Sequence, residues 1–145
     1  MFYGWESADV EAAGERIPGI RTPRDLYDAL LKVWSADTCA PRMRDQWTAD
    51  NPTLGQCSVT AFLAQDLFGG KVYGVPLGDG NYHCYNVAGG CLFDLTSEQF
   101  GDTVLNYSGN PEQSRDAHFA KAEKKERYLL LKQRLKEKQH AESHE

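Results

Sequence analysis

Two short apolar runs separated by a pair of glycines constrain the fold of this chain more than any other feature. Residues 82–87 and 91–95 are rich in aromatic, β-branched and other apolar side chains, and Gly89-Gly90 lies between them. A two-residue glycine connection between such runs is typical of a tight β-hairpin. A further extended segment, residues 71–75, precedes the first run. The sequence therefore predicts a small antiparallel sheet in the middle of the chain.

Helical patterns lie on both sides of this sheet. A helix is expected from Gln56 or Cys57 to Phe68, because apolar side chains recur on one face and a glycine pair follows. Another is expected from Thr22, which can cap it, to about Trp34.

These elements predict one α+β domain over residues 1–145, in which the helix that bears Cys57 packs on the sheet. A long run without glycine or proline, rich in Lys, Arg, Asp and Glu, predicts a further helix near the C-terminus. We expect four parts: a loose N-terminal arm (1–21), a core (22–110), a charged C-terminal helix (111–139) and a frayed tail (140–145).

Charge and composition exclude some classes of protein. The formal net charge is −5, so nucleic acid is not expected as a general partner, because phosphate binding needs a basic surface. No run of residues is apolar and long enough for a membrane span, and residues 1–20 lack the apolar core of a signal peptide. We therefore expect a cytoplasmic protein that does not contact membranes. The four cysteines form no C-x-x-C pair, which favours free thiols.

Cys57 is the first candidate for chemistry. It follows Gly55-Gln56 at the expected start of a helix. There, unpaired backbone N–H groups and the helix dipole lower a thiol pKa, favour the nucleophilic thiolate and can bind an oxyanion. The alternative is a buried structural cysteine, which is common.

His83 and Asp94 are the candidate partners of this thiol. If Gly89-Gly90 is a two-residue turn, Tyr85 opposes Asp94, and the side chains of His83 and Asp94 share one face. They are then diagonal neighbours on adjacent strands, with backbones roughly 7–8 Å apart. From there the aspartate can orient the imidazole, which can act as the base of the thiol. A three-residue loop would reverse this parity. The alternatives are a core histidine and an aspartate that forms a turn at a strand end.

Three further residues are candidates for an oxyanion or substrate contact. Gln56 adjoins the thiol and carries two amide hydrogens, although it can instead face solvent. Asn51 precedes Cys57 by six residues, but Asn51-Pro52 is also an ordinary turn, which we favour. Trp47 can line a cleft or fill the core, and we favour the core.

The motifs together resemble the YunG-like bacterial family over roughly residues 22–135. The matching motifs are Gly55-Gln56-Cys57, Gln65-Asp66-x-x-Gly69-Gly70, His83-x-x-Asn86 and Asp94-Leu95-Thr96-x-x-Gln99-Phe100. The order Cys, His, Asp is similar to papain-like and transglutaminase-like cysteine enzymes, in which the thiol opens a helix and its partners lie on antiparallel strands. This wider resemblance implies a catalytic triad. This chain differs from many of those enzymes in one respect. Only 25 residues separate Cys57 from His83, where they carry a longer insert, so we expect a minimal substrate cleft.

Three hypotheses follow. The first is a cysteine hydrolase or acyltransferase that acts on an amide or thioester of a small molecule or peptide through Cys57, His83 and Asp94, without a cofactor. The second is a non-catalytic binding module on the same fold, for which the C-terminal helix is one surface for a protein partner. The third and weakest is a metal site formed by the same three residues, because their spacing matches no standard zinc motif.

Overall fold

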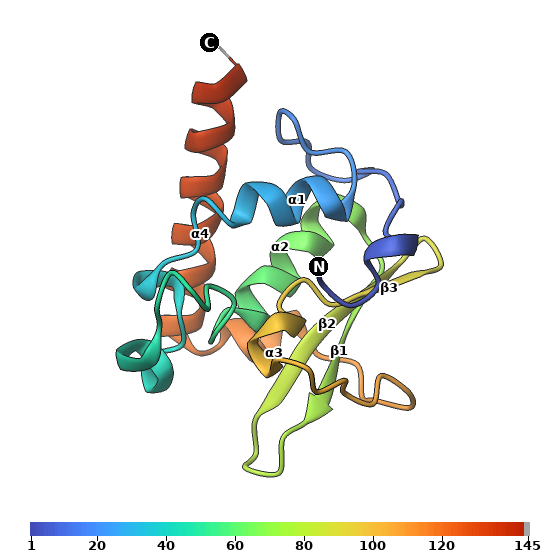
Figure 1. The fold of residues 1–145 in the computed structure, drawn as a ribbon, viewed down its shortest axis with the longest axis vertical. Coiled ribbons are helices and arrows are strands. Elements are labelled where there is room, and N and C mark those ends of the chain that lie inside the picture. Colours follow the sequence, from blue (N-terminus) through green and yellow to red (C-terminus); the bar gives the residue numbers. More distant parts are fainter. Residues whose placement is uncertain (144–145) are drawn as a thin grey trace.

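The computed structural model describes residues 1–143, which form an α+β fold (Figure 1). Three antiparallel strands lie beside a central helix, and further helices cover the other side of that helix. The elements in chain order are α1 (Pro23–Leu30), α2 (Cys57–Phe68), β1 (Lys71–Pro76), β2 (Tyr82–Ala88), β3 (Cys91–Phe93), α3 (Arg115–Phe119) and α4 (Ala122–Ser143). The predicted fold class, a helix on a small antiparallel sheet with a helix near the C-terminus, is confirmed at this level.

The sheet has the order β1-β2-β3, and its hairpin has the predicted register. Ala88 opposes Cys91 across the turn, and both turn glycines have positive φ, 57° at Gly89 and 77° at Gly90. Such a turn matches the twist of the two strands. β3 ends at Phe93, however, so the ladder stops before Asp94.

The expected opposition of Tyr85 and Asp94 is therefore wrong as a strand pairing. Asp94 forms an isolated bridge with Tyr3 instead, and its backbone N–H donates to the Tyr3 carbonyl at 3.0 Å. The chain then turns into a single 3-10 turn, Ser97–Phe100. The N-terminal segment thus supplies a backbone partner for Asp94 where the β2–β3 ladder has ended.

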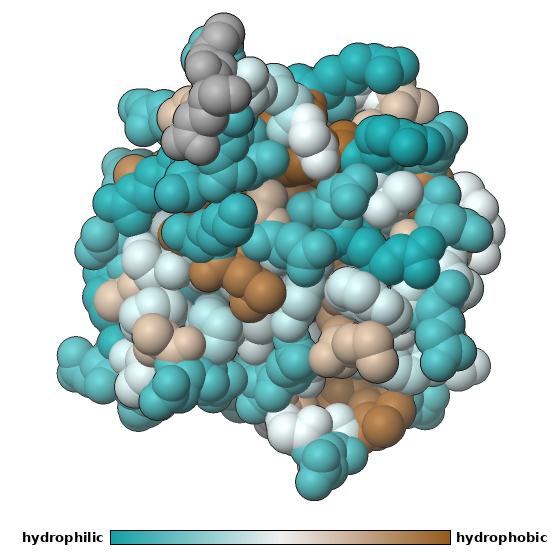
Figure 2. Space-filling model, turned by 45° about the horizontal axis from the view of Figure 1, so that its top comes forward, coloured by the Kyte–Doolittle hydropathy of each residue, from teal (hydrophilic) through white to brown (hydrophobic). Residues whose placement is uncertain are grey.

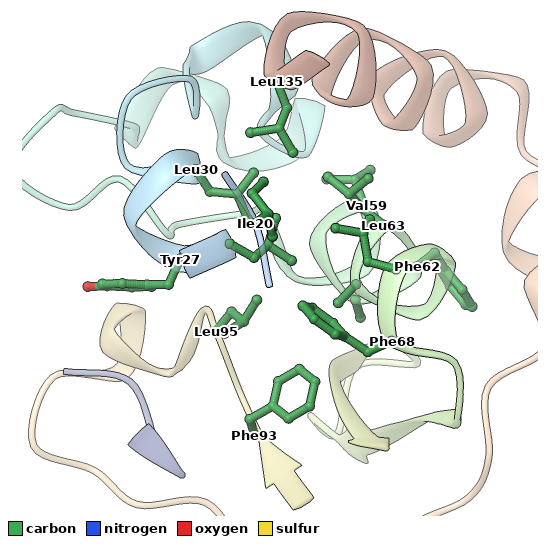
Figure 3. Packing of buried hydrophobic residues seen from close by; sticks show 14 of the residues in the cluster. Ile20, Tyr27, Leu30, Val59, Phe62, Leu63, Phe68, Phe93, Leu95 and Leu135 are labelled. Atoms are coloured by element: carbon green, nitrogen blue, oxygen red, sulfur yellow. The ribbon is translucent and has the colours of Figure 1, made fainter. Parts of the chain in front are cut away.

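α2 is the centre of the core. Nine of its 12 residues are buried, and it packs against both β2 and α4. Its predicted bounds are confirmed, with Gly69 ending the helix at φ 74°. Figure 3 shows side chains of α1, α2, β3 and α4 converging in this core. On the sheet side, the Asn86 amide donates to the Ala61 carbonyl at 2.8 Å, which ties β2 to α2.

α1 begins as predicted and ends earlier. The Thr22 N–H donates to the Asp25 carboxylate at 3.1 Å, as in a capping box. The helix ends at Leu30, and Trp34 follows in a turn with 5% exposure. Its indole N–H donates to the Thr60 hydroxyl at 3.0 Å, so that the side chain is anchored on α2.

Residues 1–21 are not the loose arm that was expected. Phe2, Ile17 and Ile20 are buried in the core, each with 4% exposure or less. The N–H groups of Ala13 and Gly14 both donate to the Leu67 carbonyl at the end of α2. These apolar residues follow no helix or strand period, because each is buried separately by an irregular chain.

The C-terminal region also differs from the single helix expected over 111–139. The chain bends between α3 and α4, and Phe119 packs on Phe62 of α2 at 5.3 Å and on Tyr128 of α4 at 4.6 Å. This packing requires the bend, because one straight helix cannot bring Phe119 against both. α4 continues to Ser143, so residues 140–143 are helical rather than frayed, and residues 144–145 of the expected tail lie outside the described part.

The face of the molecule in Figure 2 is mainly polar. Figure 2 shows a face on which hydrophilic side chains dominate and hydrophobic ones form small, separate patches. Tyr128, Leu131 and Leu135 lie on the buried side of α4, whereas Leu129 is 51% exposed. Within residues 1–143, no helix is both long and apolar enough to cross a bilayer. A protein partner for α4 stays a prediction.

Candidate functional site

Cys57 is the first residue of α2, and its position depends on Gly55. Gly55 has a φ of 72°, and a Cβ at this position would collide with the Cys39 thiol. Its carbonyl accepts a hydrogen bond from the Ala40 N–H at 2.9 Å, which fixes the chain at the helix start. Cys57 Sγ lies 3.8 Å from the Tyr82 carbonyl oxygen at the start of β2. The thiol thus lies between the N-terminus of α2 and the start of the central strand, and it is partly exposed.

His83 and Asp94 form a buried pair beside this thiol. His83 Nε2 and Asp94 Oδ2 are 2.6 Å apart, and the two side chains are 1% and 0% exposed. The same carboxylate accepts hydrogen bonds from the Tyr107 hydroxyl at 2.7 Å and from the Thr96 N–H at 3.2 Å. The Phe100 ring lies edge-on to the imidazole at 4.7 Å. The carboxylate is therefore fixed from several sides, and it fixes the imidazole.

Because Nε2 of His83 is bonded to Asp94, Nδ1 is the ring nitrogen that can interact with the Cys57 thiol. Burial opposes protonation of His83, but hydrogen bonds to Asp94 and Cys57, together with their negative charges, outweigh it and raise the pKa of His83 to about 10. At neutral pH this imidazole is consequently protonated.

The pKa of Cys57 is shifted in the opposite direction, downward. A hydrogen bond from the Cys84 thiol lowers the pKa of Cys57 well below its ordinary value, and the neighbouring His83 imidazolium acts in the same direction, while burial opposes both. The same contact and burial raise the pKa of Cys84. We assign the thiolate to Cys57, because it adjoins His83 and opens to solvent, whereas Cys84 is 1% exposed. A thiolate and an imidazolium thus coexist here near neutral pH.

A cavity of about 470 Å³ opens beside the thiol. Cys57, His83 and Phe100 line its inner end. Its walls come from residues 40–43, the loop between β1 and β2, and the corner between α3 and α4. The positively charged side chains in the lining are Arg42, Lys121, Lys124 and Arg127.

His118 also lines this cavity, although sequence reasoning placed it only in a charged helix. Its Nε2 lies 2.9 Å from Gln113 Oε1, and its Nδ1 accepts a hydrogen bond from Lys124 Nζ at 2.8 Å. Burial and the Lys124 charge lower the pKa of His118 to about 4, so it is neutral at pH 7. The only available signal was its place four residues after Ser114, which caps α3 through the Ala117 N–H and so sets the start of the helix.

The three accessory candidates do not line the cavity. Gln56 is 0% exposed and its Nε2 donates to the Ser35 carbonyl at 2.9 Å, so it does not face solvent; a role at the oxyanion stays a prediction. Asn51 lies in a turn with Thr48, the alternative favoured from the sequence. The Trp47 indole N–H donates to the Pro52 carbonyl at 3.0 Å, which closes the loop rather than walling a cleft.

The metal hypothesis gains no support from the geometry. Among residues 1–143, no group of three or more His, Cys, Asp and Glu side chains is arranged to hold an ion. Asp94 Oδ2 is already occupied by His83 and Tyr107, as described above.

Comparison with known proteins identifies the family. The YunG protein family matches residues 22–140, which is most of the chain. The chain is 34% identical over 100 residues to "Uncharacterized protein YunG" of Bacillus subtilis (strain 168), covering 69% of this chain and 81% of the relative. No solved structure matches significantly. The chain therefore belongs to the YunG family.

Proposed function

We propose that this protein is a cysteine hydrolase or acyltransferase that acts on an amide or thioester through Cys57, His83 and Asp94. One observation carries the proposal: a partly exposed thiol at a helix N-terminus adjoins a histidine whose far nitrogen is bonded to a buried carboxylate. The order of the three residues, and a thiol helix packed on an antiparallel sheet, support the likeness to papain-like and transglutaminase-like enzymes.

The reaction begins from the thiolate and imidazolium pair. The thiolate of Cys57 attacks the carbonyl carbon, and the electron pair of the C=O bond moves to oxygen. When the tetrahedral intermediate collapses, the bond to the leaving nitrogen or sulfur breaks, and His83 gives its proton to that atom. The first-turn N–H groups of α2 stabilise the oxyanion, since they have no partner within the helix.

The second half resolves the thioester on Cys57. Water or an amine attacks the acyl carbon and loses a proton to His83, and the Cys57 thiolate leaves. The imidazolium and thiolate are thereby restored, together with a carboxylic acid or a new amide. Asp94 holds the imidazole in one orientation throughout, with Nδ1 directed to the thiol.

The first test is the rate of iodoacetamide labelling at Cys57 as a function of pH. Peptide mass mapping separates Cys57 from the buried Cys39, Cys84 and Cys91. We expect a midpoint well below the free-thiol value of about 8.5. His83→Ala should move it towards that value and slow labelling at pH 6 by roughly 100-fold. His140→Ala, near the far end of α4, is the matched histidine control and should change neither.

The outcome decides between the first two hypotheses. Slow labelling with an ordinary or raised midpoint, unchanged in His83→Ala, would make Cys57 a structural cysteine and leave the binding module as the better reading. If the thiol is activated, 4-nitrophenyl acetate should give a burst of nitrophenolate and an acetyl adduct on Cys57. Cys57→Ala should abolish both. Adding a primary amine then separates transfer, which yields the N-acetyl amine, from hydrolysis.

A further inference from the structure

The cavity beside Cys57 is strongly cationic in a chain whose net charge is −5. Four of its lining side chains are Lys or Arg, and the only acidic one is Glu123. Its lining therefore carries an excess of three positive charges while the chain as a whole is negative. Since the chain carries 21 acidic residues, this segregation sets the cavity apart from the rest of the surface.

Glu123, the single acidic residue of the lining, does not neutralise Arg42, Lys121 or Lys124. Glu123 pairs with Arg127 at 2.9 Å, and Arg127 also donates to the Thr38 carbonyl at 3.0 Å, so its guanidinium is engaged in the protein. Arg42 and Lys121 are exposed at the rim. Among residues 1–143, Arg42, Lys121 and Lys124 form no ion pair with a carboxylate.

Lys124 is the most informative of these cations. It is half-buried, and its ammonium donates to the neutral His118 at 2.8 Å. Burial lowers the pKa of Lys124, as expected for a cation withdrawn from water without a carboxylate. The chain of contacts from Gln113 through His118 holds this ammonium in place at the cavity. A fixed ammonium without a carboxylate partner is suited to binding an anion.

We propose that the substrate of this thiol site carries an anionic group, a carboxylate or a phosphate, which binds to Lys124 with Lys121 and Arg42 at the rim. The inference rests on the proposed function, because it names the substrate class for the same site. Lys124 acts as the anchor, and the exposed cations attract the anion from solution.

The test compares two alkylating reagents that differ only in charge. Iodoacetate and iodoacetamide both lose iodide to an attacking thiolate, but only iodoacetate carries a carboxylate. Relative to the same cysteine in the urea-unfolded chain, we expect folded Cys57 to favour iodoacetate over iodoacetamide by about tenfold at low salt. Added sodium chloride should reduce this preference, because it screens the exposed cations.

Lys124→Gln should lower the iodoacetate preference by about threefold or more, with a smaller change in the iodoacetamide rate. Lys125→Gln is the matched control, since it removes the same charge from the next residue of α4, which does not line the cavity. Lys124→Arg should restore the preference. Circular dichroism and urea unfolding of each variant establish that it folds.

Protection of the wild-type protein gives a second test that needs no variant. Succinate and inorganic phosphate are compared with sodium chloride at equal ionic strength for their ability to slow iodoacetamide labelling. We expect one of them to protect Cys57 beyond the chloride control. Protection by succinate alone indicates a carboxylate substrate, and protection by phosphate alone indicates a phosphorylated one.

The two proposals fail in different ways. An activated thiol that shows no iodoacetate preference, no response to Lys124→Gln and no anion protection would overturn the anionic substrate and leave the cysteine chemistry intact. A thiol with an ordinary midpoint would overturn the cysteine chemistry, whatever the preference for iodoacetate.

Discussion

Two histidines face the same cavity and have opposite protonation states. His83 lies on β2 with its Nε2 bonded to Asp94, and its pKa is raised to about 10. His118 lies on α3 with its Nδ1 bonded to Lys124, and its pKa is lowered to about 4. At pH 7 one ring is therefore a cation and the other is neutral.

The contrast shows that the hydrogen-bond partner, rather than burial, decides the charge of each ring. Burial is the largest influence on both pKa values, and it favours the neutral form in both. Around His83, the carboxylate of Asp94 and the thiolate of Cys57 overcome this effect. Around His118, the ammonium of Lys124 adds to it. His83 is thus suited to proton transfer and His118 to holding a lysine.

Removing the carboxylate is the change that should break this contrast most strongly. In Asp94→Asn, His83 keeps a neighbour of similar shape but loses the charge, so its pKa should fall and the Cys57 thiolate should be lost at acidic pH. We expect iodoacetamide labelling at pH 6 to slow by at least about tenfold. The free energy of unfolding should fall by about 3 kcal/mol, since a buried ion pair is broken. Urea unfolding measures the second effect.

Tyr107→Phe is the control for this change. It removes another hydrogen bond to the same carboxylate oxygen but leaves the charge of Asp94 in place. Labelling at pH 6 should therefore stay close to that of the wild type. Equal losses of reactivity in the two variants would mean that packing, and not the carboxylate charge, sets the state of His83.

Lys124→Met should reduce the difference between the two histidines by acting on His118. It removes the charge and the donor that act on His118, although burial of the ring remains. The pKa of His118 should consequently rise from about 4 towards the ordinary 6.5 without reaching it. An NMR titration of the imidazole resonances measures this shift, and His83 should stay protonated at pH 7 in the same spectra. Lys125→Met is the control; a pKa of His118 that moved equally in both variants would contradict the assignment.

Cys84→Ala should have a smaller effect, which is on the reactivity of the Cys57 thiol. It removes the hydrogen bond that helps to lower the pKa of Cys57, while the His83 imidazolium remains. Labelling at pH 6 should slow by about fivefold, which corresponds to one hydrogen bond of about 1 kcal/mol. Cys91→Ala is the matched control, because Cys91 is also buried but contacts Asp9 instead. A midpoint unchanged in Cys84→Ala would show that His83 alone stabilises the thiolate.

Of the two histidines, the sequence predicts the place of His83 in the site but not that of His118. The position of Cys57 follows from a local rule, a helix that starts after a glycine, and the face of His83 follows from the parity of a two-residue turn. The expected strand pairing of Asp94 is wrong, yet its side chain reaches His83. The backbone of Asp94 pairs with Tyr3, and its carboxylate still lies beside the imidazole.

The place of His118 depends on contacts between distant parts of the chain. His118 reaches the cavity because α3 bends back from α4 so that its rings pack on Phe62, a tertiary contact with no local signal. The side chain of Gln56 does not line the cavity for a similar reason, since it donates to the Ser35 carbonyl in another loop. The side chain of Gln56 is thus placed by a contact with a distant loop, whereas Cys57 is placed by a helix start and His83 by a turn.

The last expected effect is on the acid stability of the fold. Because the folded pKa of His118, about 4, lies below the unfolded value of about 6.5, the unfolded chain binds more protons between these two values. The free energy of unfolding therefore falls as the pH falls through this window, and above pH 6.5 His118 causes no such loss. His118→Gln removes this proton uptake, so the variant should lose less stability than the wild type between pH 7 and pH 4.5. Urea unfolding at both pH values measures the difference, with His140→Gln as the histidine control. An identical loss in His118→Gln and the wild type would mean that His118 titrates normally, and the contrast with His83 would then be one of position and not of charge.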